Sequence, residues 1–282
     1  MRFASLSGRL HQVTAPGRVL DLHTASGGSL PADPQQAYAR WSEVLDFAAG
    51  TGAADGDRAV SEESYENPVP TPRQVFAIGL NYADHAAESA LAVPEHPPVF
   101  TKFVTSLTGP YGRIPVPQGE VDWEVELVVV IGARAHRVAA EDAWSHVAGL
   151  SVGQDLSERV LQLSGPAPQF SLGKSHPGFG PIGPVLVTPE ELPDRDDLEL
   201  GCLVNGEQMQ QGRTRDMVFP VPELIARLSA VTPLLPGDVI FTGTPSGVGL
   251  GRKPARWLNP GDELRSYVHG IGEMRHQLVE GQ

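Results

Sequence analysis

The most constraining feature of the 282-residue sequence is the stretch from Asp122 to Gly132. Its second half, from Leu127 to Ile131, is apolar and rich in valine, and a glycine ends it, which is typical of a buried strand. Side chains alternate between the two faces of a strand. Three acidic side chains are therefore predicted to share one face, namely Asp122, Glu124 and Glu126.

Acidic side chains in this arrangement favour a metal site. Three carboxylates on one face of a strand that enters a core repel one another and resist desolvation. A hard divalent cation removes that penalty, and carboxylate oxygens suit Mg²⁺, Mn²⁺ or Ca²⁺. The alternative is a solvated strand end with a charged edge. Asp155 follows a second apolar run, Val147 to Gly153, and carboxylates from two adjacent strand ends can close one cation site.

The charge and cysteine content exclude several classes of function. A net charge of −13 and a pI of about 5.1 disfavour nucleic acid and anionic membranes as partners, so an anionic substrate needs local cations. The single cysteine, Cys202, excludes an intramolecular disulfide and a thiolate metal cluster, and its apolar neighbours predict burial. No stretch reaches the ~18 apolar residues of a membrane span, and we recognise no signal peptide, so we expect a cytoplasmic protein.

The chain is predicted to contain a small N-terminal α/β domain, residues 1–70, and a catalytic domain, residues 71–282. The apolar spacing from Tyr38 to Phe47 predicts a helix, and the composition of residues 49–64 predicts a linker or surface loop. In the second domain, strands are predicted at Val185 to Val187 and, as the last strand, at Glu263 to Val268. The N-terminal part carries no obvious chemical constellation.

A candidate general base follows the apolar run Val75 to Gly79. The alanine-rich segment after it favours a short helix, in which His85 and Glu88 share a face. A carboxylate beside an imidazole raises its basicity and orients it, as a general base requires. The alternative is a surface pair worth only ~0.2–0.5 kcal/mol.

Two lysines are weaker candidates. Lys102 lies in a predicted strand, Val99 to Phe103, and is interpreted as a lysine that reaches solvent at a sheet edge, with a substrate cation as the alternative. Lys174 does not belong to a phosphate-binding loop, because Pro168 occupies the position of the required first glycine. Taken alone, Lys174 is more typical of a solvated lysine than of a ligand contact.

Polar groups for a substrate could come from two further segments. The turn from Leu156 to Gln162 is predicted to be helical, so that Arg159 and Gln162 share a face. The glycine-rich loop from Pro236 to Gly249 could offer backbone N–H groups and the Thr244 hydroxyl to a carboxylate. No helix follows this loop, which argues against a dinucleotide fingerprint.

Six segments, in this order along the chain, resemble the fumarylacetoacetate hydrolase family. They are Gly79 to His85, Asp122 to Leu127, Gly153 to Asp155, Gly173 to Ser175, Phe179 to Pro184 and Gly237 to Gly249. Together they cover about residues 73–275, and residues 1–70 are similar to the variable N-terminal domain of many members.

The resemblance implies an α+β fold, a mixed and mostly antiparallel β-roll with short helices, in a protein that is usually a homodimer. It also implies a role for each candidate site residue except Asp122, which matches no ligand and is left as a residue at the start of the strand. The implied roles are metal ligands at Glu124, Glu126 and Asp155, usually for Mg²⁺ or Mn²⁺; a catalytic dyad at His85 and Glu88; an active-site lysine at Lys174; and contacts to the 2-oxo acid end of the substrate at Arg159, Gln162 and Thr244.

The implied activity is metal-dependent hydrolysis of a C–C bond in a small anionic 1,3-diketo or 2-oxo acid, such as an acylpyruvate. The same groups without an attacking water would support oxaloacetate decarboxylation or isomerisation of 2-hydroxyhepta-2,4-diene-1,7-dioate. A non-catalytic ligand-binding member of the fold is the alternative from a different class. The complete set of carboxylates, dyad and lysine argues against that last alternative.

Overall fold

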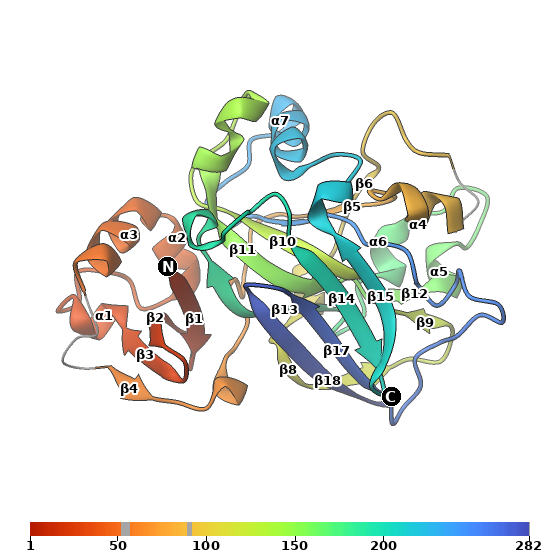
Figure 1. Cartoon of the computed structure of the whole chain (residues 1–282), viewed down its shortest axis with the longest axis horizontal. Coiled ribbons are helices and arrows are strands. Elements are labelled where there is room, and N and C mark those ends of the chain that lie inside the picture. The colour runs from red at the N-terminus through yellow and green to blue at the C-terminus, as the bar shows by residue number, and fades with distance from the viewer. Residues whose placement is uncertain (52–56, 89–91, 282) are drawn as a thin grey trace.

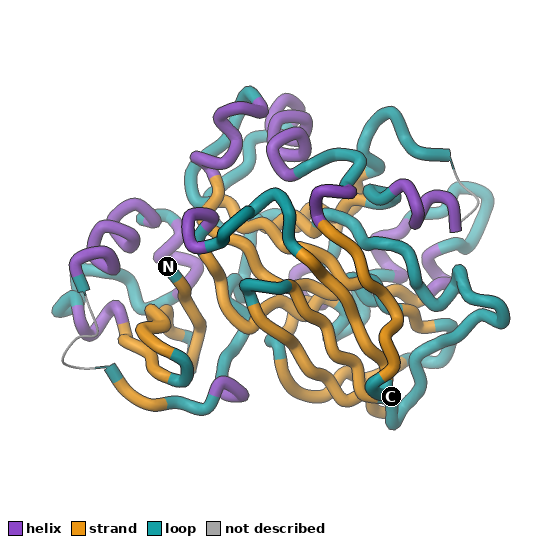
Figure 2. The backbone as a smooth tube through the Cα atoms, in the orientation of Figure 1, coloured by secondary structure: helices purple, strands orange, loops and turns teal. Residues whose placement is uncertain are grey.

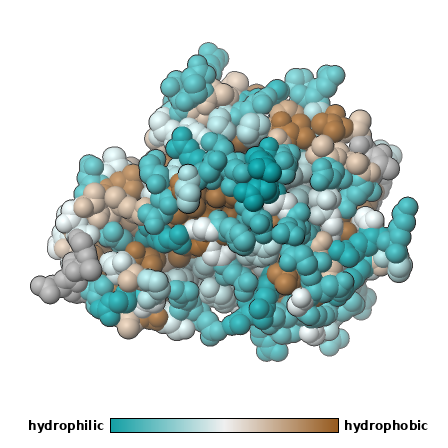
Figure 3. Space-filling view, viewed as in Figure 1, coloured by the Kyte–Doolittle hydropathy of each residue, from teal (hydrophilic) through white to brown (hydrophobic). Residues whose placement is uncertain are grey.

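The computed structural model describes residues 1–51, 57–88 and 92–281. Strands predominate and mostly pair antiparallel, while short helices lie around them, which confirms the predicted fold class (Figures 1 and 2). The central part of the predicted linker, residues 52–56, lies outside the described residues. The face seen in Figure 3 is largely hydrophilic, in keeping with the charged composition.

The largest sheet has eleven strands and runs through the whole molecule. In spatial order they are β4 (Arg58–Ala59), β3 (Arg18–Asp21), β2 (Arg9–Ala15), β1 (Arg2–Leu6), β13 (Gly180–Val187), β11 (Val147–Gln154), β10 (Val125–Ile131), β16 (Val239–Phe241), β5 (Val75–Ile78) and β6 (Val99–Thr101), with β7 (Leu107–Thr108) beside β13. The pairs β5–β16 and β7–β13 are parallel and the others antiparallel.

Two smaller sheets complete the strand structure of the described residues. The five-stranded sheet consists of β15 (Glu207–Arg213), β14 (Glu199–Val204), β17 (Glu263–Val268), β18 (Gly272–Glu280) and β8 (Tyr111–Val116), of which β18 and β8 are parallel. A two-stranded ladder joins β9 (Val121–Asp122) to β12 (Ser157–Glu158).

The helices are short. The α-helices are α1 (Leu22–Ala25), α2 (Pro34–Tyr38), α3 (Trp41–Gly50), α4 (Ala83–Glu88), α5 (Arg159–Gln162), α6 (Phe170–Gly173) and α7 (Val221–Val231). Single 3₁₀ segments are η1 (Glu62–Ser64), η2 (Val104–Ser106), η3 (Ala140–His146), η4 (Pro189–Glu191) and η5 (Thr214–Asp216). None of the helices in the described ranges has the length and apolar character needed to cross a membrane.

Strand β10 shows why the sequence alternates as it does. Val125, Leu127 and Val129 lie in the hydrophobic core that β10 shares with the five-stranded sheet. Val128 and Val130 point to the opposite face, into a second core formed with the N-terminal helices. Every residue of β10 is buried, so each of its side chains points into one of the two cores. Glu126 belongs to the second set by its position in the strand, which is why its carboxylate lies inside the protein.

The N-terminal segment shares both a sheet and a core with the rest of the chain. Strand β1 pairs with β13, placing Phe3 opposite Leu186. Phe3 packs edge-on against Trp41 of α3, with ring centroids 5.0 Å apart, in the same core as Val128. The predicted helix over 38–47 is found as α3, displaced toward the C-terminus because Arg40 leaves the helical conformation. The division at residue 70 stays a prediction about independent folding units.

Two strand predictions were wrong, one about where a strand begins and one about which strand is the last. Strand β13 begins at Gly180 and not at Val185, because Pro181 and Pro184 disguise a strand that is buried along its whole length. Strand β17 is not the last, since β18 follows it and pairs with both β17 and β8. In β18 the buried residues Met274, His276 and Leu278 alternate with exposed polar ones. Because one of the three buried residues is a histidine, the apolar pattern of this strand is weak.

Candidate active site

Three carboxylates meet where β10 begins and β11 ends. Val125 lies opposite Gln154 in the antiparallel pair, so the next residues outward, Glu124 and Asp155, lie at the same end of the sheet. The backbone N–H of Asp155 donates to the carbonyl of Glu124 over 2.9 Å. Glu124, Glu126 and Asp155 are buried, and each offers an oxygen within 4.8 Å of the other two. The structure therefore brings the three predicted metal ligands together.

Lys174 binds this cluster directly. Its Nζ donates to Glu124 Oε2 over 2.7 Å, to Asp155 Oδ2 over 2.8 Å and to Ser157 Oγ over 2.7 Å. Burial opposes the charge of the ammonium group, but the carboxylates of Asp155 and Glu124 outweigh it and raise the pKa of Lys174. The interpretation of Lys174 as a solvated lysine is wrong, because its side chain is 2% exposed. With all three N–H donors engaged, its first role is to hold two carboxylates in place.

Lys102 is a second buried lysine in the cluster, and the sequence prediction missed it. The prediction of a lysine that reaches solvent is wrong: the Lys102 side chain is 0% exposed, and its Nζ lies 2.6 Å from Asp155 Oδ1. It also donates to the carbonyl oxygen of Lys174. Burial lowers the pKa of Lys102 even though Asp155 attracts the proton. Strand β6 ends at Thr101, which lets the chain turn Lys102 inward.

The residues present fit a divalent cation, and Glu126 provides the physical argument. Its Oε2 accepts the backbone N–H of Gly243 over 2.7 Å, but among the described residues no cationic side chain forms an ion pair with it. Burial, together with the charges of Asp155 and Glu124, raises the pKa of Glu126 well above its usual value. A hard cation between the three carboxylates would stabilise all of them in the charged form, and their oxygens are the ligands that Mg²⁺, Mn²⁺ and Ca²⁺ prefer.

Asp122 is more than a residue at the start of a strand. The strand is interrupted after Asp122, which lies in β9 and is fully buried. Its Oδ2 accepts from Arg159 Nε and Nη2 at 2.9 and 2.7 Å, and its Oδ1 accepts the backbone N–H of Gly249 at 2.6 Å. Arg159 Nη1 in turn lies 2.7 Å from Glu124 Oε1. Asp122 thus connects the glycine-rich loop to the carboxylate cluster through Arg159.

The Asp122→Asn variant is expected to lower the free energy of unfolding by about 3–5 kcal/mol, because a buried guanidinium loses the charged acceptor of two hydrogen bonds. Denaturant unfolding monitored by circular dichroism measures the change. The matched control is Glu223→Gln on α7, which removes an exposed ion pair with Arg227 and should cost less than ~1 kcal/mol. Equal, small effects of the two substitutions would show that Asp122 is not the anchor described here.

His85 and Glu88 form a hydrogen-bonded pair at one wall of the site. His85 Nδ1 lies 2.8 Å from Glu88 Oε1, and the side chains are 10% and 18% exposed, so the surface-pair alternative does not describe them. The backbone N–H of Gly247 donates to Glu88 Oε2 over 2.9 Å. Gly247 has φ of +105°, and a Cβ there would lie 2.2 Å from the carbonyl oxygen of Met209, so only glycine allows this approach. With Nδ1–H donated to Glu88, Nε2 is the basic nitrogen of the ring.

A cavity of about 300 Å³ lies beside these groups. It is lined by six of the nine predicted site residues together with apolar side chains: His85, Glu124, Arg159, Gln162, Lys174 and Thr244, with Ile78, Gly79, Leu80, Phe100, Leu163, Phe170, Val248 and Leu250. Glu88 supports His85 from behind, and Asp155 and Glu126 complete the carboxylate cluster. All predicted site residues therefore belong to one region of the protein.

Gln162 and Thr244 are the predicted neutral contacts for a substrate carboxylate. The Gln162 Oε1 atom accepts from Arg159 Nη1 over 2.9 Å, which turns the amide NH₂ group of Gln162 away from the arginine. The Thr244 hydroxyl donates to the carbonyl of Val125 over 2.8 Å, so its proton is already used. The predicted contact between this hydroxyl and a substrate stays a prediction. The backbone N–H of Thr244 forms no hydrogen bond within the described part of the chain, and it is a further candidate donor.

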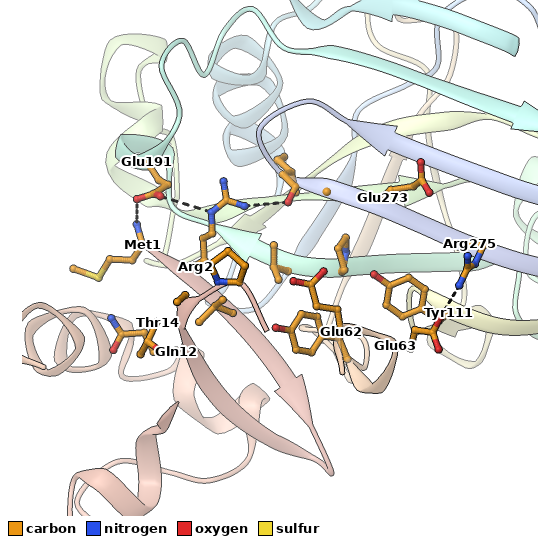
Figure 4. Close-up of a pocket in the computed structure, with 18 residues that line it drawn as sticks. Met1, Arg2, Gln12, Thr14, Glu62, Glu63, Tyr111, Glu191, Glu273 and Arg275 are labelled. Atoms are coloured by element: carbon orange, nitrogen blue, oxygen red, sulfur yellow. Dashed lines mark hydrogen bonds and ion pairs between the residues drawn. The ribbon is translucent and has the colours of Figure 1, made fainter. Parts of the chain in front are cut away.

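A larger cavity, about 750 Å³, lies away from the carboxylates between the N-terminal strands and β18 (Figure 4). Charged residues line it, including Arg2, Glu191, Glu273 and Arg275. Arg2 lies 3.6 Å from Glu191, and Arg275 lies 2.6 Å from the exposed Glu63. Glu124, Glu126 and Asp155 do not line this cavity, so the chemistry is assigned to the smaller one.

The fold and this site define a member of the fumarylacetoacetate hydrolase family. The sequence model of the fumarylacetoacetate (FAA) hydrolase C-terminal domain matches residues 74–279, and the chain belongs to this family. Its relatives are enzymes that include hydrolases, isomerases and oxaloacetate tautomerases.

Three relatives illustrate the range of the family. The human mitochondrial oxaloacetate tautomerase FAHD2A is 40% identical over 287 residues, covering 96% of this chain and 91% of that protein. The 2,4-didehydro-3-deoxy-L-rhamnonate hydrolase of Sphingomonas sp. (strain SKA58) is 43% identical over 84% of each chain. The maleylpyruvate hydrolase of Sphingobium sp. SYK-6, whose structure holds manganese(II) and pyruvate, aligns over the full length of both chains with a TM-score of 0.82 and 29% identity.

Proposed function

We propose that this protein is a divalent-metal-dependent hydrolase that cleaves the C–C bond of an acylpyruvate-like 1,3-diketo acid. The observation that carries the proposal is a buried carboxylate cluster facing the same cavity as a histidine oriented by a carboxylate. The relative from Sphingobium, a hydrolase with manganese and pyruvate in its structure, supports both the metal and the three-carbon 2-oxo acid product.

In this proposal the 2-oxo acid end of the substrate lies against the polar side of the cavity. The Gln162 amide and the Thr244 backbone N–H donate to the substrate carboxylate. Arg159 has one N–H of Nη2 left after its bonds to Asp122, Gln162 and Glu124, and its charge adds attraction for the anion. Lys174 keeps Glu124 and Asp155 in position for the metal.

The hydrolytic step begins with a water molecule beside His85. His85 Nε2 accepts a proton from the water, whose oxygen attacks the distal carbonyl carbon of the substrate, while Glu88 stabilises the imidazolium. The bond between that carbon and the methylene breaks, and the methylene takes a proton. The products are a carboxylic acid and pyruvate. When bound, the divalent ion supplies Lewis-acid stabilisation of the enolate charge that develops on the 2-oxo acid.

Tautomerisation of oxaloacetate is the second candidate function, and the 40% identity to the human tautomerase over 96% of this chain favours it. Keto–enol exchange moves one proton between carbon and oxygen, and the His85–Glu88 pair can carry that proton. Decarboxylation of oxaloacetate and isomerisation of a dienol diacid use the same enolate stabilisation without water attack. A probable 2-hydroxyhepta-2,4-diene-1,7-dioate isomerase from Mycobacterium abscessus aligns over this whole chain at 29% identity and supports the isomerase alternative.

A substrate panel tests these proposals. The purified protein is incubated with acetylpyruvate, oxaloacetate and 2-hydroxyhepta-2,4-diene-1,7-dioate, each with and without Mg²⁺ or Mn²⁺. We expect metal-dependent release of pyruvate and acetate from acetylpyruvate. A protein that interconverts the tautomers of oxaloacetate and leaves acetylpyruvate intact would establish the second candidate instead.

We also propose a two-fold symmetric homodimer formed through the catalytic domain. The five-stranded sheet ends at β15 and β8, each of which has one edge without a strand partner in the described structure. Such edges favour further pairing or coverage. Light scattering coupled to size exclusion at micromolar concentration should therefore give twice the chain mass of 30.1 kDa. A mass of one chain would refute the proposal.

A further inference from the structure

The cavity of about 300 Å³ changes from polar to apolar between its floor and its mouth. Its floor consists of buried polar side chains, of which Glu124 is 6% exposed, Arg159 4% and Lys174 2%. Its rim includes exposed apolar side chains, with Leu163 at 48% and Leu250 at 40%. A substrate whose 2-oxo acid end lies on the floor therefore directs its other end along an apolar wall.

Two aromatic rings form that wall directly beside the polar floor. Phe100 and Phe170 pack edge to face with ring centroids 5.6 Å apart. The Lys174 Nζ atom lies 5.1 Å from the centroid of the Phe100 ring, so the apolar surface begins where the carboxylate cluster ends. These rings present carbon, and not hydrogen-bonding groups, to whatever extends past the dyad.

The close packing of α6 on α5 continues the wall to the rim. A Cβ at Gly173 would lie 2.6 Å from the backbone nitrogen of Gln162, so only glycine lets the two helices approach this closely. This approach places Phe170 and Leu163 in the lining of one cavity. Leu163 follows Gln162 immediately, so the polar contact and the apolar contact are adjacent in sequence.

Among the described residues, a second carboxylate on the substrate would find no free cation along this wall. The cations among the described lining residues are Arg159 and Lys174, apart from His85 if it is protonated. Lys174 gives its three N–H groups to Glu124, Asp155 and Ser157. Arg159 is held on the floor by Asp122. An anionic distal group would lose its water against Phe100, Phe170 and Leu163 without compensation.

We propose that the distal acyl group of the substrate is uncharged and apolar, an alkanoyl or aroyl group, and that Leu163 at the rim selects for it. This inference rests on the proposed function, because it takes the 2-oxo acid end to lie on the polar floor. It distinguishes this chain from an enzyme for diacids. Each methylene buried at the wall should raise kcat/KM by a factor of about four.

Hexanoylpyruvate and adipoylpyruvate test the proposal, since their six-carbon acyl groups differ only in a terminal methyl against a terminal carboxylate. The wild-type protein with Mg²⁺ is expected to show at least about tenfold higher kcat/KM for hexanoylpyruvate. Equal values, or a preference for adipoylpyruvate, would overturn the inference while leaving acylpyruvate hydrolysis established. Hydrolysis of neither compound would instead remove the proposed function.

Two lysine variants place the selectivity at the rim. Leu163→Lys brings a cation to the cavity and should reduce the preference for hexanoylpyruvate by at least about fivefold. The control is Leu161→Lys, two residues earlier in the chain, at a residue that is 39% exposed and does not line the cavity. It should leave the ratio unchanged, and equal effects of both variants would contradict the assignment. Calorimetric affinities of the His85→Ala variant for the two compounds give the same ratio without turnover, so the preference is measured even if hydrolysis fails.

Discussion

The Glu126→Gln variant is expected to lose divalent-metal binding and all metal-dependent activity while keeping its fold. Glu126 is the one carboxylate of the three ligand candidates that, in the described structure, has no cationic partner. Its neutralisation therefore removes repulsion from the metal-free protein and leaves no buried cation unpaired. Manganese binding followed by electron paramagnetic resonance, with thermal unfolding of the metal-free protein, measures both consequences.

Three comparisons make this result specific. Glu124→Ala and Asp155→Ala should also abolish activity, but each strands a lysine or arginine in the interior, so stability should fall by about 3–5 kcal/mol as well. Glu120→Gln, at an exposed position close by in sequence, is the matched control and should bind Mn²⁺ like the wild type. Unchanged Mn²⁺ affinity in Glu126→Gln would show that the carboxylate cluster is not the metal site.

The His85→Ala variant is expected to lower kcat for acetylpyruvate by ~10²–10⁴, the usual contribution of a general base. KM should change less, because in the proposed arrangement Gln162, Thr244 and the metal hold the 2-oxo acid end of the substrate. Glu88→Gln should lose less than His85→Ala, since the imidazole remains but is less basic and less well oriented. Steady-state kinetics on the metal-loaded enzyme provide both parameters.

A second substrate shows whether His85 activates the attacking water or is needed for every reaction of the site. Decarboxylation of oxaloacetate needs no attacking water, so any such activity should fall much less in His85→Ala than acetylpyruvate hydrolysis does. His96→Ala, at an exposed histidine in the loop that follows α4, is the control and should alter neither reaction. If His85→Ala kept acetylpyruvate hydrolysis within about threefold of the wild type, another group would have to activate the water.

Local patterning explains how much of the fold could be predicted. Strand β10 could be recognised because each of its side chains enters one of two cores, which gives both the valine run and the alternation before it. Strand β13 could not be delimited, because its prolines contradict the usual pattern of a buried strand. Strand β1 pairs with β13, although the paired residues lie about 180 positions apart in the sequence. No local pattern of the N-terminal segment indicates this partner.

The candidate site shows the same division between local and long-range information. The spacing of His85 and Glu88 is local, as is that of Glu124 and Glu126 at the start of β10, and the structure brings these residues together. The burial of Lys102 depends on Asp155 and on the carbonyl of Lys174, which lie 53 and 72 positions away. Asp122 binds Gly249 at a separation of 127 positions. A single lysine or aspartate gives no sign of such partners, so solvation was the wrong expectation for Lys102.

The most direct test of the central claim is pyruvate release from acetylpyruvate by protein that has been stripped of metal with EDTA. Pyruvate is measured by its coupled reduction, before and after addition of Mg²⁺ or Mn²⁺, with the chelator removed. We expect no enzymatic release from the stripped protein, and equimolar pyruvate and acetate once the ion is restored. Full activity in the stripped protein would contradict it.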